Sequence, residues 1–341
     1  MQIDMHYYGT FAMARAAGLR KDVCKVIATA SQYVDDNAKN KEIELADGSC
    51  VHIIATAHHA ASIKNISKKD QRKVWVPFHF LPGNEGPEFR DKLICRKNSS
   101  IVEQVKKYVL DQKDSDYFVE LTGIFAHIYA DTFSHYGFSG ITDERNKVFQ
   151  KQIRYLNVLD SIFRHLEERK EQFLARFAES TRLGHGAVFT YPDRPFLEWE
   201  LKYEKTEEVV IHDNLTSFNE GCRALYDYFR KVGVVRPDLQ DKKDIVEYEE
   251  IGQCINQILK QQKSKPERIA LWNEEAIKGN LYNSREVIPE YENWNKELKA
   301  LRLCDSETVK SHVLYHFFQA ASIYRTYLLR DLLPKNGLIV G

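Results

Sequence analysis

Hydrophobic residues recur at helical spacing through most of this chain, which predicts a predominantly helical protein. The helix that begins at Ser99, for example, carries Ile101, Val105 and Val109 on one face. The expected helices cover residues 7–17, 21–36, a long region from Ser99, 116–135 (ending before Gly137), 143–180 (one or two helices), and four stretches after Asp213, of which the last is 306–333.

A few segments depart from that periodicity. Residues 42–46 and 50–57 flank the turn sequence Asp47-Gly48 and are expected to form one small β-hairpin. The aromatic run 75–80 reads as a short extended segment, residues 64–73 as a charged connection, and residues 183–199 as irregular. The predicted fold is therefore all-α with one hairpin, and a large central sheet would contradict it.

Charge and composition narrow the classes of function. Lys+Arg and Asp+Glu both number 49 in 341 residues, so the chain lacks the basic excess of a duplex nucleic-acid binder. No signal peptide or transmembrane segment is evident, and the six scattered cysteines form no CxxC pair. These features predict a cytoplasmic protein with reduced thiols.

The sharpest chemical pattern is His127-x-x-x-Asp131-x-x-x-His135. At about 100° per residue the three side chains fall within about 80° of one helix face. The two histidines are separated by about 12 Å along the axis, too far to share an ion with bonds of about 2.1 Å. Two ions with Asp131 between them fit better.

The alternative reading is a polar stripe or hydrogen-bonded core histidines. The segment around the three residues, which includes Leu121, Phe125 and Phe133, is apolar on nearly every side and predicts a buried helix. A buried aspartate between two histidines needs a cation or an equivalent partner.

Other candidate ligands are single residues with weaker patterns. They are His6 near the amino terminus, Asp35 and Asp36 at the end of a helix, His79 in an aromatic run, His185 between two glycines, and Asp193 eight residues later. Asp35 is preferred over Asp36 because it lies nearer the apolar face of its helix.

Further histidines form a second tier. His58 and His59 end the second hairpin strand, where neighbours point to opposite faces. His312 and His316 have the i,i+4 spacing of a metal pair but sit on an amphipathic packing helix, so a structural role is favoured.

This ordered set resembles the zinc-dependent bacterial phospholipases C and the single-strand nucleases of fungi and plants. In that superfamily three zinc ions are bound in a mostly helical domain. The order of ligands is an amino-terminal residue and a nearby His, an Asp, a His in a His-Phe context, a helical HxxxD, a following His, and a later His with an acidic partner. The matching residues here are His6, Asp35 or Asp36, His79, His127, Asp131, His135, His185 and Asp193.

The chain departs from the pattern at two places. Met1 and Gln2 stand where family enzymes use a processed amino terminus, and Phe189 stands one turn after His185, where the acidic partner is expected. The resemblance covers about residues 1–200, a metal-binding catalytic core, with residues 201–341 expected as helices packed on it in one continuous domain.

The resemblance implies a zinc-dependent phosphoester hydrolase of phospholipase C or phosphodiesterase type, with two or three ions. Asp131 would bridge ions, and Asp35 or Asp36 would also orient the attacking water. A small phosphodiester or a phospholipid head group is the expected substrate.

Two alternatives stay open. The first is a non-catalytic, metal-stabilised helical binding module. The second is an HD-type metallophosphohydrolase, for which His212-Asp213 is the available dipeptide.

Overall fold

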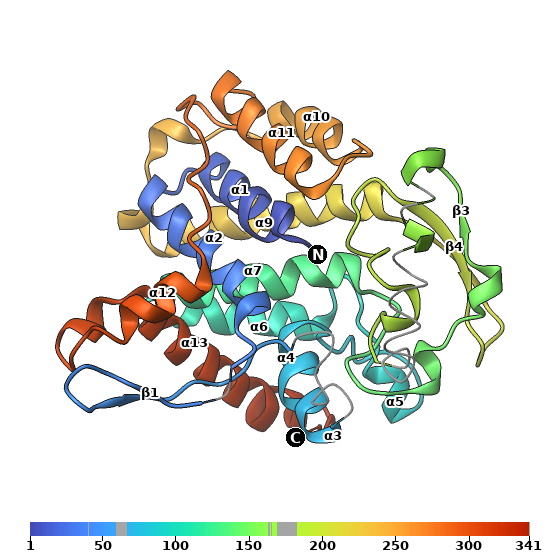
Figure 1. Cartoon of the computed structure of the whole chain (residues 1–341), viewed down its shortest axis with the longest axis horizontal. Helices are drawn as coiled ribbons and strands as arrows, with labels where there is room; N and C mark the ends of the chain where they lie inside the picture. Colours follow the sequence, from blue (N-terminus) through green and yellow to red (C-terminus); the bar gives the residue numbers. More distant parts are fainter. Residues whose placement is uncertain (40, 59–66, 163, 165, 169–182, 341) are drawn as a thin grey trace.

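The computed structural model describes residues 1–39, 41–58, 67–162, 164, 166–168 and 183–340. Helices dominate it and the sheets are small, which confirms the predicted fold class (Figure 1). Within these residues no helix combines the length and the apolar character needed to span a bilayer.

The α-helices are α1 Thr10–Ala16, α2 Lys21–Asp36, α3 Lys68–Asp70, α4 Val76–Phe78, α5 Phe89–Lys92, α6 Ser100–Asp111, α7 Phe118–Ser134, α9 Asn214–Val235, α10 Tyr248–Leu259, α11 Lys265–Lys278, α12 Trp294–Leu301, α13 Val313–Tyr327 and α14 Leu333–Lys335. The π-helical segments are η1 Asp4–Gly9, η3 Gln71–Trp75 and η11 Leu328–Leu332. Single 3₁₀ turns are η4 Glu144–Asn146, η5 Gln150–Gln152, η7 Gly186–Val188, η8 Pro237–Leu239, η9 Lys242–Asp244 and η10 Thr308–Ser311. The strands are β1 Ile43–Glu44, β2 Cys50–Val51, β3 Arg154–Tyr155, β4 Glu198–Lys202 and β5 Val209–Asp213.

Helix α7 runs through the middle of the molecule, and α2, α9, α13 and α6 pack around it (Figure 1). All but one of its residues are buried, as its nearly continuous apolar sequence predicts. Gly123 lets α2 approach the backbone of α7, because a Cβ there would lie 2.3 Å from the carbonyl oxygen of Ile27. This close crossing brings the end of α2 toward the polar residues of α7.

The main core draws apolar side chains from both ends of the chain. Phe11, Ile27 and Phe125 belong to it, as do Phe229 and Phe317 of the later helices. Residues before and after position 200 therefore share one hydrophobic cluster.

The predicted hairpin is present as β1–β2, in which Ile43 lies opposite Val51. A second, antiparallel sheet with the order β3-β4-β5 was not predicted. Alternating burial along β4 is the period-two pattern of a strand, but only five residues carry it. This sheet covers a smaller core that includes Phe138, Tyr191 and Trp199.

Four local predictions were wrong in whole or in part. Residues 68–73 of the expected connection and most of 75–80 are helical, because Ser67 caps a helical segment by accepting from the Asp70 N–H, and this segment runs from α3 through η3 into α4. In the range 143–180, only the first part departs from the prediction, since it forms 3₁₀ turns and strand β3. The described residues 160–162, 164 and 166–168 are helical as expected, and positions 163, 165 and 169–180 lie outside the described residues. After Asp213 there are five helices of at least eight residues, α9 to α13, in place of four.

Candidate metal centre

The end of α7 brings its three polar residues together. His127 Nε2 lies 3.2 Å from Asp131 Oδ2, one helical turn along the same face. His135 is the first residue after the helix, and its Nδ1 lies 3.5 Å from the same oxygen. Gly137 has a φ of 89°, a left-handed conformation that turns the chain away after His135.

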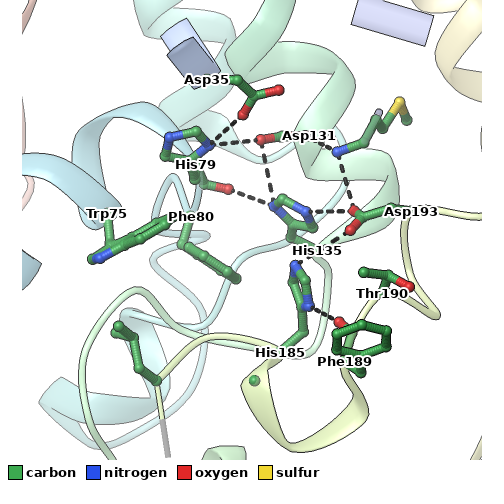
Figure 2. A pocket seen from close by; sticks show the side chains of 13 residues that line it. Asp35, Trp75, His79, Phe80, Asp131, His135, His185, Phe189, Thr190 and Asp193 are labelled. Atoms are coloured by element: carbon green, nitrogen blue, oxygen red, sulfur yellow. Dashed lines mark hydrogen bonds and ion pairs between the residues drawn. The ribbon is translucent and has the colours of Figure 1, made fainter. Parts of the chain in front are cut away.

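Three other elements add candidate ligands from distant parts of the sequence. His6 on η1 places Nε2 3.2 Å from Asp131 Oδ1. His79, just after α4, places Nδ1 3.2 Å from Asp131 Oδ2. Asp35, at the end of α2, has a carboxylate oxygen 3.9 Å from His79 Nδ1 and 4.0 Å from His127 Nε2. Figure 2 shows Asp35, His79 and Asp131 converging on one point.

These residues form three groups, in each of which one donor atom per residue lies within 4.8 Å of the others. The groups are His6, His127 and Asp131; Asp35, His79 and His127; and His135, His185 and Asp193. Because Asp131 contacts residues of all three groups, it is placed as a bridging ligand would be.

Three histidines are held by main-chain carbonyls. His79 Nε2 lies 2.9 Å from the Thr56 oxygen, His135 Nδ1 lies 2.9 Å from the His79 oxygen, and His185 Nδ1 lies 2.7 Å from the Phe189 oxygen. A ring nitrogen facing a carbonyl must carry the proton, so the other nitrogen is left as an acceptor facing the cluster. This is the arrangement usual for histidines that bind metals.

The third group contains Asp193. Its Oδ1 lies 3.2 Å from His135 Nε2, and its Oδ2 lies 4.0 Å from His185 Nε2. Phe189 contributes its carbonyl instead of an acid and has a φ of 53°, a conformation unusual for a bulky residue. The acidic partner of His185 was expected one turn later, at position 189. Asp193 provides this carboxylate instead.

The α-amino group of Met1 also lies in this cluster. It is 2.6 Å from Asp131 Oδ1 and 3.2 Å from Asp193 Oδ1. Burial lowers the pKa of this amine, but the carboxylates of Asp131, Asp193 and Asp35 outweigh burial and raise the pKa to about 11. The ligand order expected from the resemblance begins with an amino-terminal residue, and the Met1 amine lies at that place in the cluster.

Asp36 does not join any of these groups. Its carboxylate accepts hydrogen bonds from the Tyr291 hydroxyl and from Gln32 Nε2. Successive residues of a helix point about 100° apart, so the residue next to Asp35 faces away from the cluster. Asp36 is therefore removed from the candidate ligands, and Asp35 is kept.

Burial and neighbouring charges set the protonation states of these groups to the forms that bind a cation. Burial would raise the pKa of the fully buried Asp131, but His135, the Met1 amine, His127 and His6 hold it well below its usual range. Burial lowers the pKa of His6 to about 3 and of His185 to about 4, so both rings are neutral at pH 7. Neutral imidazole and ionised carboxylate are the forms that bind metals.

A pocket of about 290 Å³ opens onto the cluster. Trp75, Phe80 and Phe189 form aromatic walls, and Figure 2 shows them around His135 and His185. Of the described residues that line the pocket, none is a lysine or an arginine. The side chain of Asp35 remains 32% exposed, so the cluster is open to solvent on its side.

None of the described second-tier histidines belongs to the three groups. His58 Nε2 is 3.6 Å from Asp70 Oδ1, and His59 is outside the described residues. His312 is the N-cap of α13, where Nδ1 accepts from the Leu314 N–H, so it does not share a helix face with His316.

The dipeptide of the HD alternative is split across strand β5. His212 is buried, whereas Asp213 is exposed and caps α9 by accepting from the Thr216 N–H. An HD-type site needs both side chains at one ion, so this dipeptide does not supply it.

Comparison with known proteins gives a family without an assigned function. A family model described as "Family of unknown function (DUF6765)" matches residues 1–332. The chain belongs to this family. No curated protein and no solved structure matches it significantly. The match spans every candidate ligand from His6 to Asp193.

Proposed function

We propose that this protein is a metal-dependent phosphoester hydrolase whose centre holds two or three divalent ions, with zinc as the first choice. The observation that carries the proposal is the convergence of four histidines and Asp35 on the buried carboxylate of Asp131, in a largely buried cluster that His185 and Asp193 extend. Anchoring of three rings by main-chain oxygens supports the same conclusion.

The donor set fits zinc. Imidazole nitrogens and carboxylate oxygens without thiolates are typical of hydrolytic zinc sites, whereas structural sites often use cysteines and have four protein ligands. His6 Nδ1 and His127 Nδ1 have no hydrogen-bond partner among the described residues, and His6 Nε2 lies 3.2 Å from the Asp131 carboxylate. A buried polar atom without a partner costs free energy, and an ion at His6 would remove part of that cost.

Bound divalent ions would supply a hydroxide at neutral pH and charge for the phosphoryl oxygens. The residues of the chain would have separate tasks. Asp131 would link neighbouring ions, and His135, His185 and Asp193 would hold the ion nearest the pocket walls. Asp35, the most exposed carboxylate of the cluster, is placed to accept a proton from a water molecule that enters from the pocket.

The lining of the pocket favours a phosphodiester over a phosphomonoester. A monoester carries close to two negative charges at neutral pH, and the described lining has no lysine or arginine to balance the second. A diester has one charge, and the aromatic walls can contact an ester substituent. A small diester or a phospholipid head group remains the proposed substrate class.

The test combines metal content with a substrate panel. Purified protein should contain at least two zinc equivalents by mass spectrometry. It should hydrolyse bis(p-nitrophenyl) phosphate and p-nitrophenylphosphorylcholine faster than p-nitrophenyl phosphate. Chelation should abolish the activity and zinc should restore it. Protein that binds no divalent metal would refute the proposal, whereas metal without hydrolysis of any ester would favour the non-catalytic binding module.

A further inference from the structure

A second cavity, of about 270 Å³, lies against the turn that follows His135. Tyr136 and Gly137 form part of its wall, and Tyr203 and His212 of the three-stranded sheet form another part. His135 itself faces the metal centre. The cavity is therefore separate from the pocket over the cluster and shares only this turn with it.

His212 is the unusual residue of this cavity. It is 1% exposed, and neither ring nitrogen has a hydrogen-bond partner among the described residues. Its ring stacks on Trp199 at 4.5 Å between centroids and lies 4.7 Å from the ring of Tyr136. Burial lowers the pKa of His212 to about 3, so at neutral pH the ring offers one N–H donor and one acceptor nitrogen.

A buried histidine without partners calls for a polar group that the described residues do not supply. Packing of the ring alone does not need nitrogen atoms, since a phenylalanine would stack on Trp199 equally well. A ligand or water molecule in the cavity is the remaining source of a partner.

The charges of the cavity favour an anion. Arg96, Arg145 and Lys205 line it together with Asp91 and Glu208, which gives three cations against two carboxylates. Arg145 is neutralised by close contacts with Asp91, Asp143 and Glu88. Among the described residues, Arg96 pairs only with the exposed Glu85, at 3.5 Å, and Lys205 has no carboxylate within 4 Å.

The walls favour a planar ring. Tyr136 and Tyr203 present aromatic side chains, and the Tyr203 hydroxyl is already used to donate to the Gly137 carbonyl at 3.1 Å. The volume is below the usual range for pockets that hold drug-sized ligands, which limits the ligand to about one ring.

We propose that this cavity binds a small aromatic carboxylate, with its ring beside Tyr136 and Tyr203, its acid group near Arg96 and Lys205, and a polar ring substituent at His212. This site is independent of the proposed hydrolase function. No covalent step is involved.

Binding can be measured by isothermal titration calorimetry with 4-hydroxybenzoate, benzoate and cyclohexanecarboxylate. We expect 4-hydroxybenzoate to bind best and cyclohexanecarboxylate worst. Because a carboxylate could also bind zinc, each titration is repeated in the presence of a chelator. Binding that vanishes with the metal would assign the ligand to the metal centre and overturn the proposal.

Two variants test separately the contact of His212 with the ring substituent and the contact of Arg96 with the carboxylate. His212→Phe keeps the ring stacking and should weaken 4-hydroxybenzoate about tenfold, the cost of a lost hydrogen bond, while leaving benzoate unchanged. Arg96→Gln, at a side chain 39% exposed, should weaken both aromatic acids to a similar degree without affecting the fold. Lys107→Gln, with the same change of charge at a remote and exposed position on α6, is the control.

The proposal fails if wild-type protein binds none of the acids at millimolar concentration, or if both His212→Phe and Arg96→Gln bind as the wild type does. Circular dichroism and melting temperature check that His212→Phe is folded. If His212→Phe is not folded, the affinities of Arg96→Gln and Lys107→Gln for the aromatic acids still test the proposal.

Discussion

His127 Nε2 lies 3.3 Å from His79 Nδ1, although the two residues are 48 positions apart in the sequence. Two imidazole nitrogens at this distance, both near Asp131 Oδ2, can bind one ion with bonds of about 2 Å. The condition for a shared ion, rings within about 5 Å, is therefore met by the fold. Several consequences can be measured.

Asp131→Asn should damage the protein's activity more than His135→Ala does. Asp131 contacts His6, His79, His127 and the Met1 amine, whereas His135 belongs to one group. We expect Asp131→Asn to lower the metal affinity and the phosphodiesterase rate about a hundredfold or more. Loss of a residue that only hydrogen-bonds to a metal ligand usually costs about 10- to 100-fold, and loss of a bridging ligand should cost more. His135→Ala should empty one site and leave the ion at His79 and His127. Full metal content and rate in Asp131→Asn, with circular dichroism unchanged, would mean that the cluster is only a buried polar network.

Removal of metal should lower the melting temperature. The cluster holds ionised carboxylates in a buried site, and a ligand that binds only the folded state adds about 4 kcal/mol to the free energy of unfolding at a thousandfold excess over its Kd. Scanning calorimetry with and without a chelator measures the change, and added zinc should reverse it. Asp36→Asn is the control variant, because Asp36 contacts Tyr291 and Gln32 instead of the cluster. Its melting temperature should fall on chelation as that of the wild type does. An unchanged melting temperature on chelation would contradict metal binding.

Gly123→Ala should destabilise the fold by about 1–3 kcal/mol, the usual cost of overpacking. The new Cβ would lie 2.3 Å from the Ile27 oxygen and 2.7 Å from the Ala30 Cβ, so α2 must move away from α7. That movement shifts Asp35 relative to His127, and zinc affinity should fall as well.

The control for that substitution is Gly252→Ala on α10. There the Cβ meets only Tyr248 ring atoms at 3.3 and 3.7 Å, and alanine is the better helix former by about 1 kcal/mol. Urea unfolding of both variants should give changes of opposite sign. Equal effects would mean that the α2–α7 contact is not tight.

Glu120 predicts a pH dependence of stability away from the metal centre. Burial raises the pKa of this carboxyl from 4.5 to about 7. Between these values the folded state binds more protons than the unfolded state, so the free energy of unfolding falls as pH rises, and the full cost is present above pH 7. At 1.36 kcal/mol per pKa unit that cost is about 3 kcal/mol.

Glu120→Gln removes this ionisation. The variant should match the wild type near pH 4.5 and exceed its stability at pH 8, as measured by urea unfolding at both values. Glu204→Gln, at an exposed position, should leave the free energy of unfolding unchanged at both pH values. A constant difference between Glu120→Gln and the wild type across the range would show that Glu120 does not titrate in this interval.

Local periodicity was enough to predict the helical class, the β1–β2 hairpin and the shared face of His127 and Asp131. These features depend on contacts between residues a few positions apart, and the sequence displays such spacing directly. Strand β4 and the helical turn before His79 escaped prediction because their local signals are only a few residues long.

Tertiary structure decided which of the candidate residues meet. Helical phase already favours Asp35 over Asp36 in the sequence, but it does not say what Asp35 meets. The crossing of α2 over α7 at Gly123 brings Asp35 to His127, while Asp36 accepts a hydrogen bond from Tyr291. Asp193 reaches His135, and the carbonyls of Thr56, His79 and Phe189 orient the rings, through packing of distant segments. Main-chain atoms carry no residue identity, so no side-chain pattern could indicate these contacts.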